Sequence, residues 1–302
     1  MVLHPQAEAA LAQWARGPRV TDPGYDVDEQ RRLARQEAAA EPREQVGHVV
    51  DIDSDGVPCR LYLPADPTSP DPGAGGAIVF LHGGGFVFGD LDTHDAQARR
   101  TANRTGLAVF AVDYRRPPEH RFPAAPDDVD TAVAWLVVNG PTMGIDISRL
   151  VALGDSAGGN LALVAALRNP NLFAATVLVY PFLDPRQRFE SYRREAGGLG
   201  VEEAAWYWQQ YVGAREDLDH HDLAPLESEA LDTLPPTLVV AAEHDPLVDE
   251  NLELVRRLEA AGVDVTLSTY PGMIHGFWRN PTQFDAAKES LAEIAAFLRE
   301  TL

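Results

Sequence analysis

Residues 150–158, Leu-Val-Ala-Leu-Gly-Asp-Ser-Ala-Gly, decide the fold. Their apolar start predicts a buried strand, and the apolar run at residues 161–167 predicts a helix directly after it. A strand that runs straight into a helix needs a tight turn, and Gly154 and Gly158 allow neighbouring backbones to pass closely. The pattern therefore predicts that Ser156 is exposed at the carboxyl end of a sheet, beside a helix N-terminus.

The rest of the chain repeats this succession of strand and helix. The predicted strands span residues 46–52, 59–63, 77–81, 107–112, 150–154, 176–180, 237–242 and 265–270. The predicted helices among them span residues 94–105, 124–139, 157–168, 247–261 and 281–300. The later strands are apolar at consecutive positions, as expected when helices cover both faces of a parallel sheet. The sequence predicts one doubly wound α/β domain, with an eight-stranded, mostly parallel sheet.

The last predicted helix carries its own start motif. Asn280 can cap it, and Pro281 fits its first turn. Apolar residues then recur on one face at Phe284, Leu291, Ile294 and Leu298.

Two segments do not follow the alternation. The sequence predicts two helices in residues 1–45 and, in residues 185–225, a helical insert rich in tryptophan and tyrosine. We expect both segments to form a cap over a catalytic domain at residues 46–302. A proline- and glycine-rich loop at residues 64–76 joins two strands.

The composition bears on which partners and which cellular location the protein has. The 302-residue chain carries 25 basic and 46 acidic residues, a formal charge of −21, which disfavours nucleic acid and anionic membrane surfaces as partners. No apolar run is long enough to span a bilayer, and the N-terminus lacks the pattern of a signal peptide, so we expect a cytoplasmic protein. Cys59, the single cysteine, lies in a predicted strand and is expected to be a buried structural thiol.

A serine nucleophile needs a histidine base and a carboxylate that orients it. Asp245 follows the strand at residues 237–242, and His275 follows the strand at residues 265–270. The chain order serine, aspartate, histidine is the order of α/β-hydrolases. His244 is the rival base, and Asp249 is the rival acid, although a capping or bracing role suits Asp249 better. The remaining histidines lie away from strand ends or in linking segments.

The run His82-Gly83-Gly84-Gly85-Phe86 follows another predicted strand. Glycines expose backbone N–H groups, and acyl transfer needs such donors for the oxyanion of the tetrahedral intermediate. We expect Gly83, Gly84 and Gly85, together with the N–H of Ala157, to form an oxyanion hole, while His82 holds the loop by hydrogen bonding. A phosphate-binding loop would need the lysine of G-x-x-x-x-G-K-[ST], which is absent.

No cofactor or metal is expected. The sequence contains no H-x-x-x-H motif, and no G-x-G-x-x-G follows a strand. The pair His220-His221, with Asp219 and Asp222, is interpreted as a solvated acidic loop rather than a metal site.

Taken together, these motifs resemble the hormone-sensitive-lipase-like family of α/β-hydrolases, in particular its bacterial carboxylesterases. The resemblance runs from about residue 46 to the C-terminus. It is carried by the glycine run at 82–86, Asp113-Tyr114-Arg115, Pro118-Glu119-His120, Phe122-Pro123-Ala124, Gly154-Asp155-Ser156-Ala157-Gly158-Gly159-Asn160, Asp245-Pro246-Leu247, Asp249-Glu250 and His275-Gly276-Phe277. Pro117, which precedes Pro118-Glu119, stands where this family usually has alanine.

The resemblance implies an α/β-hydrolase fold, a Ser156–His275–Asp245 triad, and hydrolysis of small esters with short to medium acyl groups. Side chains expected to contact substrate are Phe86, Asp155, Trp206 and Ile274. An amidase or formamidase with the same triad stays an alternative, as does a ligand-binding receptor of this fold, although such receptors typically lose a triad member. A homodimer is a further prediction.

Overall fold

A computed structural model describes residues 2–65, 75–194, 197–213 and 218–302 of the chain. It contains an eight-stranded sheet in the order β1-β2-β4-β3-β5-β6-β7-β8. The strands β1 to β8 are His48–Ser54, Val57–Leu63, Ala77–Leu81, Ala108–Val112, Leu150–Asp155, Phe173–Val179, Thr237–Ala242 and Val265–Tyr270. The strand β2 pairs antiparallel with β1 and β4, and the pairs from β4 to β8 are parallel. The predicted fold class is therefore confirmed.

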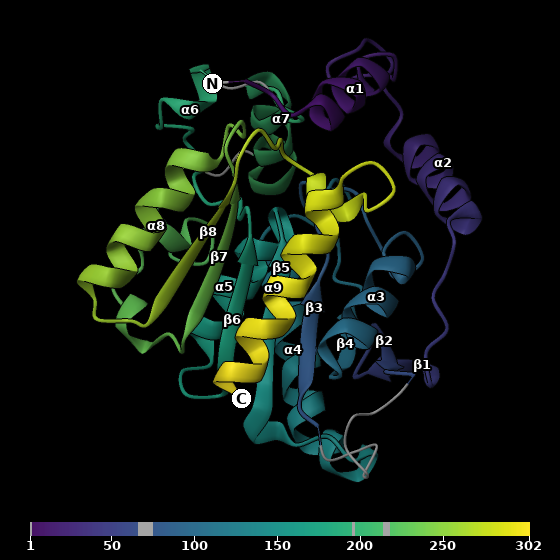
Figure 1. Ribbon diagram of the computed structural model, residues 1–302, viewed down its shortest axis with the longest axis vertical. Helices are drawn as coiled ribbons and strands as arrows, with labels where there is room; N and C mark the ends of the chain where they lie inside the picture. Colours follow the sequence, from purple (N-terminus) through teal and green to yellow (C-terminus); the bar gives the residue numbers. More distant parts are fainter. Residues whose placement is uncertain (1, 66–74, 195–196, 214–217) are drawn as a thin grey trace.

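Helices cover both faces of this sheet (Figure 1). The helices α3 (Asp95–Thr105) and α9 (Asp285–Thr301) pack on one face. The helices α4 (Ala124–Asn139), α5 (Ala157–Arg168) and α8 (Val248–Ala260) pack on the other. Two apolar cores result, one on each side, and both bury the consecutive aliphatic residues of the central strands. This double burial explains why those strands are apolar throughout.

Four helices lie beyond the carboxyl ends of the parallel strands (Figure 1). They are α1 (Pro5–Trp14), α2 (Val27–Ala40), α6 (Ser191–Arg194) and α7 (Val201–Val212). The helices α1 and α2 belong to residues 1–45, and α6 and α7 belong to the predicted insert at residues 185–225. Residues 195–196 and 214–217 of this insert lie outside the described part. Residues 66–74 of the predicted loop at 64–76 lie outside it as well.

Several element boundaries differ from the prediction, most clearly at α9. This helix begins at Asp285 rather than at residue 281, and its N-cap is Phe284 with extended backbone. Asn280 instead accepts backbone hydrogen bonds from Gln283 and Phe284, which closes a separate turn. The ring of Phe284 is fully buried and packs edge-on against Trp14 of α1, so tertiary packing sets where the helix starts.

The single cysteine lies inside the molecule. Cys59 on β2 is 1% exposed, and its sulfur lies 3.1 Å from the Ser54 hydroxyl. Burial raises the pKa of its thiol to about 12, so it stays protonated and unreactive near neutral pH. Within the described residues, none of the helices combines the length and apolar character needed to cross a bilayer.

Candidate active site

The turn between β5 and α5 holds Ser156 in a strained conformation. Its φ of 54° and ψ of −119° lie outside the regions that non-glycine residues usually occupy. A Cβ on Gly158 would overlap the carbonyl oxygen of Leu81 on the neighbouring strand β3, so only glycine fits there. The backbone of Ser156 donates to Val179 on β6 at 2.9 Å, which fixes the turn against the sheet. The serine side chain is therefore held at the sheet edge, beside the N-terminus of α5.

Ser156, His275 and Asp245 meet at this edge. The Nε2 of His275 lies 3.0 Å from Oγ of Ser156, and its Nδ1 lies 2.7 Å from Oδ2 of Asp245. The other oxygen of Asp245 accepts the backbone N–H of Leu247 at 2.9 Å. Because Asp245 is fully buried and held at both oxygens, it fixes the imidazole so that Nδ1 carries the proton and Nε2 faces the serine.

The charge of Asp245 controls the basicity of His275. Burial alone would lower the pKa of His275, but the charge of Asp245 and its hydrogen bond outweigh burial. The pKa of His275 therefore lies above its usual value, which makes the imidazole a better proton acceptor.

The glycine run, with the residues after it to Asp90, forms what we call the glycine loop (residues 83–90). Its first N–H, from Gly83, donates to the Asp155 carboxylate at 3.1 Å. The next two N–H groups, from Gly84 and Gly85, have no acceptor in the described part of the chain, and both residues line the cavity that contains Ser156. Gly84 and Gly85, but not Gly83, therefore line the cavity at Ser156.

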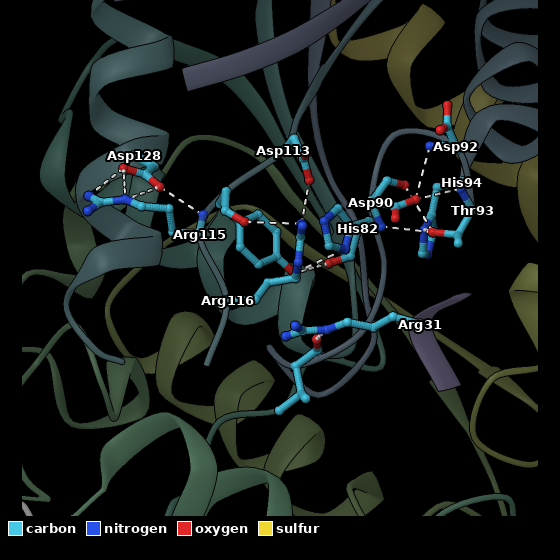
Figure 2. Close-up of polar contacts among 12 residues, drawn as sticks. Arg31, His82, Asp90, Asp92, Thr93, His94, Asp113, Arg115, Arg116 and Asp128 are labelled. Carbon is cyan, nitrogen blue, oxygen red and sulfur yellow. Dashed lines mark hydrogen bonds and ion pairs between the residues drawn. The ribbon is translucent and has the colours of Figure 1, made fainter. Parts of the chain in front are cut away.

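Buried polar side chains hold this loop, and Figure 2 shows His82 and Asp90 among them. The Nδ1 of His82 lies 2.9 Å from the carbonyl oxygen of Gly83, and the hydroxyl of Tyr114 donates to the carbonyl of His82 at 2.7 Å. Burial and the charge of Arg116 lower the pKa of His82 to about 3, so this histidine is neutral and not a base for Ser156. At the far end of the loop, Asp90 accepts the N–H of Thr93 at 2.8 Å.

Two cavities with shared lining residues lie at this site, and Ser156 lines the inner one. The inner one measures about 230 Å³, and the outer groove, between the α1–α2 segment and α7, measures about 840 Å³. The inner cavity is lined by Trp14, Gly84, Gly85, Asp155, Ser156, Tyr180, Phe182, Gly198, Leu199, Glu203, Tyr207, His275, Gly276, Arg279 and Asn280. Both cavities share Trp14, Gly198, Leu199, Glu203, Tyr207 and Arg279. Residues of both segments, 1–45 and 185–225, therefore contribute walls to these cavities.

Of the side chains expected to contact substrate, Asp155 alone lines these cavities, through a carboxyl that also holds Gly83. Phe86 is fully buried and stacks on Tyr211 at 3.8 Å between ring centroids. Trp206 packs against Tyr25 and Phe88, and Ile274 is fully buried. These three side chains support the walls instead of forming them.

The lining residues that the sequence did not single out come from several segments. Glu203 and Tyr207 stand four residues apart on α7, and the Tyr207 hydroxyl donates to Glu203 at 3.1 Å. This spacing was a usable indication that both residues share one helix face. Trp14 recurs with Ala7 and Leu11 at helical spacing, which indicates one face of α1, whereas no motif in the sequence includes Arg279.

The rival residues have other contacts. Asp249 accepts the backbone N–H of Ser191 at 2.8 Å and thereby braces the insert, as its predicted loop-bracing role required. His244 lies 3.9 Å from the Glu243 carboxylate. The potential ligand atoms of His220, His221 and Asp222 lie within 4.8 Å of one another, but Asp222 already pairs with Arg168 at 2.7 Å.

Comparisons with known proteins agree with this geometry. The family model for the alpha/beta hydrolase fold matches residues 78–279. The chain belongs to the α/β-hydrolase family. This α/β-hydrolase is 38% identical over 254 residues to ethyl acetate hydrolase of Pseudomonas putida, covering 82% of the chain and 79% of that protein. It is 30% identical to an arylesterase of Saccharolobus solfataricus, with 99% of each chain covered.

Solved structures extend the similarity to the whole chain. The hyperthermophilic esterase of the archaeon Pyrobaculum calidifontis superimposes with a TM-score of 0.87 at 34% identity, covering 99% of each chain. An esterase of the bacterial hormone-sensitive lipase family superimposes with a TM-score of 0.85 at 28% identity, covering 100% of this chain and 99% of that one. The α/β-hydrolase described here thus belongs to the hormone-sensitive-lipase-like group, as its motifs indicated.

Proposed function

We propose that this α/β-hydrolase is a serine carboxylesterase that hydrolyses small esters with short to medium acyl groups. The esterase activity is supported by the relatives, which are named as ester hydrolases. One observation carries the mechanism: the continuous path of short contacts from Asp245 through His275 to Oγ of Ser156.

In the proposed acylation, His275 removes the proton of Ser156 while Oγ attacks the ester carbonyl carbon. The backbone N–H groups of Gly84, Gly85 and Ala157 receive the oxyanion, because these donors stand beside the nucleophile without a described acceptor. His275 then gives its proton to the departing alcohol. Asp245 stabilises the imidazolium that exists in between.

Deacylation repeats these steps with water. His275 accepts a proton from water, the hydroxide attacks the acyl carbon, and the acid leaves as Ser156 regains its proton. The role of Gly83 differs from that of the other two glycines, because its N–H is already bound by Asp155. We therefore assign Gly83 to positioning of the loop.

Residues 1–45 and 185–225 are proposed to act as a cap that selects substrates. Support comes from Trp14 of α1 and Tyr207 of α7, which both line the inner cavity. The expected homodimer stays a prediction.

The test of the nucleophile is Ser156→Ala, with Ser148→Ala, on an exposed 3-10 turn, as the matched control. Ser156→Ala should lower turnover of 4-nitrophenyl butyrate by several powers of ten and abolish labelling by a serine-directed phosphonate. Near-normal turnover in folded Ser156→Ala would refute the assignment. A parallel series of aryl amides separates an esterase from an amidase: faster amide cleavage would favour the latter.

A further inference from the structure

Arg279 places a positive charge in the wall of the active site. It ends the 3-10 turn Phe277–Arg279, four residues after His275. Its side chain lines both the inner cavity and the outer groove, and the residue is partly buried. It therefore stands where the portion of a substrate beyond the ester group would extend.

The guanidinium of Arg279 makes no hydrogen bond or ion pair with another described residue. By contrast, two other partly buried arginines have carboxylate partners: Arg116 pairs with Asp113, and Arg168 pairs with Asp222. Guanidinium groups carry five donors and are rarely left without acceptors when they are partly withdrawn from water. The free donors of Arg279 thus distinguish it from these structural arginines.

Nearby carboxylates are already engaged elsewhere. Glu203 shares the cavity with Arg279, but its carboxylate accepts the Tyr207 hydroxyl at 3.1 Å, and no ion pair within 4.0 Å joins it to Arg279 in the described part of the chain. Asp155 holds Gly83. Burial raises the pKa of Asp155, and the charge of Arg279, which lines the same cavity, opposes that rise.

We propose that Arg279 binds a carboxylate carried by the ester substrate, so that the favoured substrates are esters with a free carboxylate at a distance from the scissile bond. The inference rests on the proposed esterase function and adds the substrate class. A planar guanidinium matches a carboxylate with two parallel hydrogen bonds, which fixes the substrate as well as attracting it. The overall charge of −21 does not prevent this contact, because long-range repulsion is screened by salt whereas a partly buried pair is screened far less.

Two substrate pairs test the proposal. In the first, the acyl side carries the charge: mono-4-nitrophenyl glutarate is compared with its neutral primary amide. In the second, the alcohol side carries it: 3-(4-acetoxyphenyl)propionate is compared with its primary amide. For each pair the readout is the ratio of kcat/KM for the acid to kcat/KM for the amide.

The wild-type enzyme should favour the acid in at least one pair by roughly tenfold, mainly through a lower KM, since a charge-assisted contact is of that order. Arg279→Gln should remove the preference, and Arg279→Lys should keep part of it because the charge remains. Glu203→Gln should increase the preference by removing a nearby negative charge. Arg299→Gln, an exposed site on α9, is the matched control and should leave the ratio unchanged.

A wild-type ratio near one in both pairs would overturn the proposal without any variant, as would an Arg279→Gln ratio equal to that of the wild type. In either case continued hydrolysis of the neutral amides would leave the esterase function intact. Loss of hydrolysis of every ester, including 4-nitrophenyl butyrate, would instead remove the proposed function and this inference with it.

Discussion

The helices α7 and α2 hold the same glycine loop by opposite physical means. The helix α7 uses aromatic rings: Tyr211 stacks on Phe86 of the loop, and Trp208 packs beside it at 5.3 Å. The helix α2 has no buried residue, and it reaches the loop through two arginines. Arg31 donates to the carbonyl of Val87 at 3.0 Å, and Arg35 lies 2.5 Å from the Asp90 carboxylate (Figure 2 shows the Arg31 contact).

This difference has a consequence for how the loop responds to conditions. Apolar burial is nearly independent of pH and is not weakened by moderate salt, whereas ion pairs depend on both. We therefore expect α2 to detach from the loop under conditions that leave α7 in place. The outer groove, which lies between these segments, would then open on the α2 side.

Tyr211→Ala tests the aromatic side and should have the largest effect. Because the ring is fully buried against Phe86, its removal should lower the free energy of unfolding by about 3–5 kcal/mol, the usual cost of emptying a buried aromatic site. It should also lower kcat more than it raises KM, since the Gly84 and Gly85 donors would be less well fixed. Urea unfolding and steady-state kinetics with 4-nitrophenyl butyrate measure the two effects.

The matched control is Tyr211→Phe. The Tyr211 hydroxyl is buried without a hydrogen-bond partner in the described part of the chain, so its removal should change the free energy of unfolding by less than about 1 kcal/mol. Equal losses for the alanine and phenylalanine variants would show that ring stacking does not hold the loop.

Arg31→Gln tests the ionic side. The Arg31 side chain is 13% exposed and donates to the carbonyls of Val87 and Pro117 as well as to Glu119. Its loss leaves these acceptors without their donor and should lower the free energy of unfolding by about 1–3 kcal/mol. Arg32→Gln on the same helix is the control: Arg32 is exposed and pairs within α2, so no measurable change is expected. A similar loss of unfolding free energy in both variants would show that the contacts of Arg31 do not hold α2 on the loop.

Acid should release α2 before α7. Burial raises the pKa of Glu119, but its hydrogen bond to Arg31 outweighs burial, and the pKa of Asp90 is likewise lowered overall by Thr93 and Arg35. Because these pKa values are depressed in the folded state, their stabilisation is present above the unfolded values near pH 4 and is lost as pH falls through the folded values. Pepsin digestion from about pH 4.5 down to about pH 3 should therefore cut α2 before α7. Simultaneous cleavage of both helices would contradict the ionic attachment of α2.

Salt should have the smallest effect. Raising NaCl from about 0.05 M to about 0.5 M shortens the screening length severalfold. Since exposed ion pairs contribute up to about 1 kcal/mol, amide exchange in α2 should accelerate about twofold to fivefold. Exchange in α7 serves as the internal control and should not change. Mass spectrometry of peptides covering the two helices measures both rates in one sample, and faster exchange in α7 alone would contradict the expectation.

The sequence could predict the fold and the positions of Ser156, Asp245 and His275, because each of them follows a strand with a local pattern. That pattern is an apolar run in β5 and β7 and a run rich in β-branched residues in β8. The carboxyl ends of parallel strands share one sheet edge, so adjacency in space followed from the order of elements. Their catalytic roles stay a proposal. The loop contact of His82 was also predictable, since it is made to its neighbour Gly83 in the motif. A bracing role was predicted for Asp249 as well, but its partner Ser191 lies 58 residues away and had no local pattern that named it.

The walls of the site could not be predicted in the same way. The residues Trp206, Tyr207 and Trp208 are adjacent in the sequence, yet their side chains meet different surroundings, because the rotation of α7 is set by where Tyr211 and Phe86 pack. The same holds for the start of α9, where burial of Phe284 overrides the local start motif. Packing between distant segments has no periodic pattern in the sequence.

The buried, protonated thiol of Cys59 makes this enzyme suited to fluorescence work. Because the natural chain has no second cysteine, a maleimide dye would react only with a cysteine introduced at an exposed position such as Ala39 on α2 or Val138 on α4. A donor and an acceptor dye at those two positions would report the separation of α2 from the catalytic domain in single molecules. No native residue would first have to be replaced.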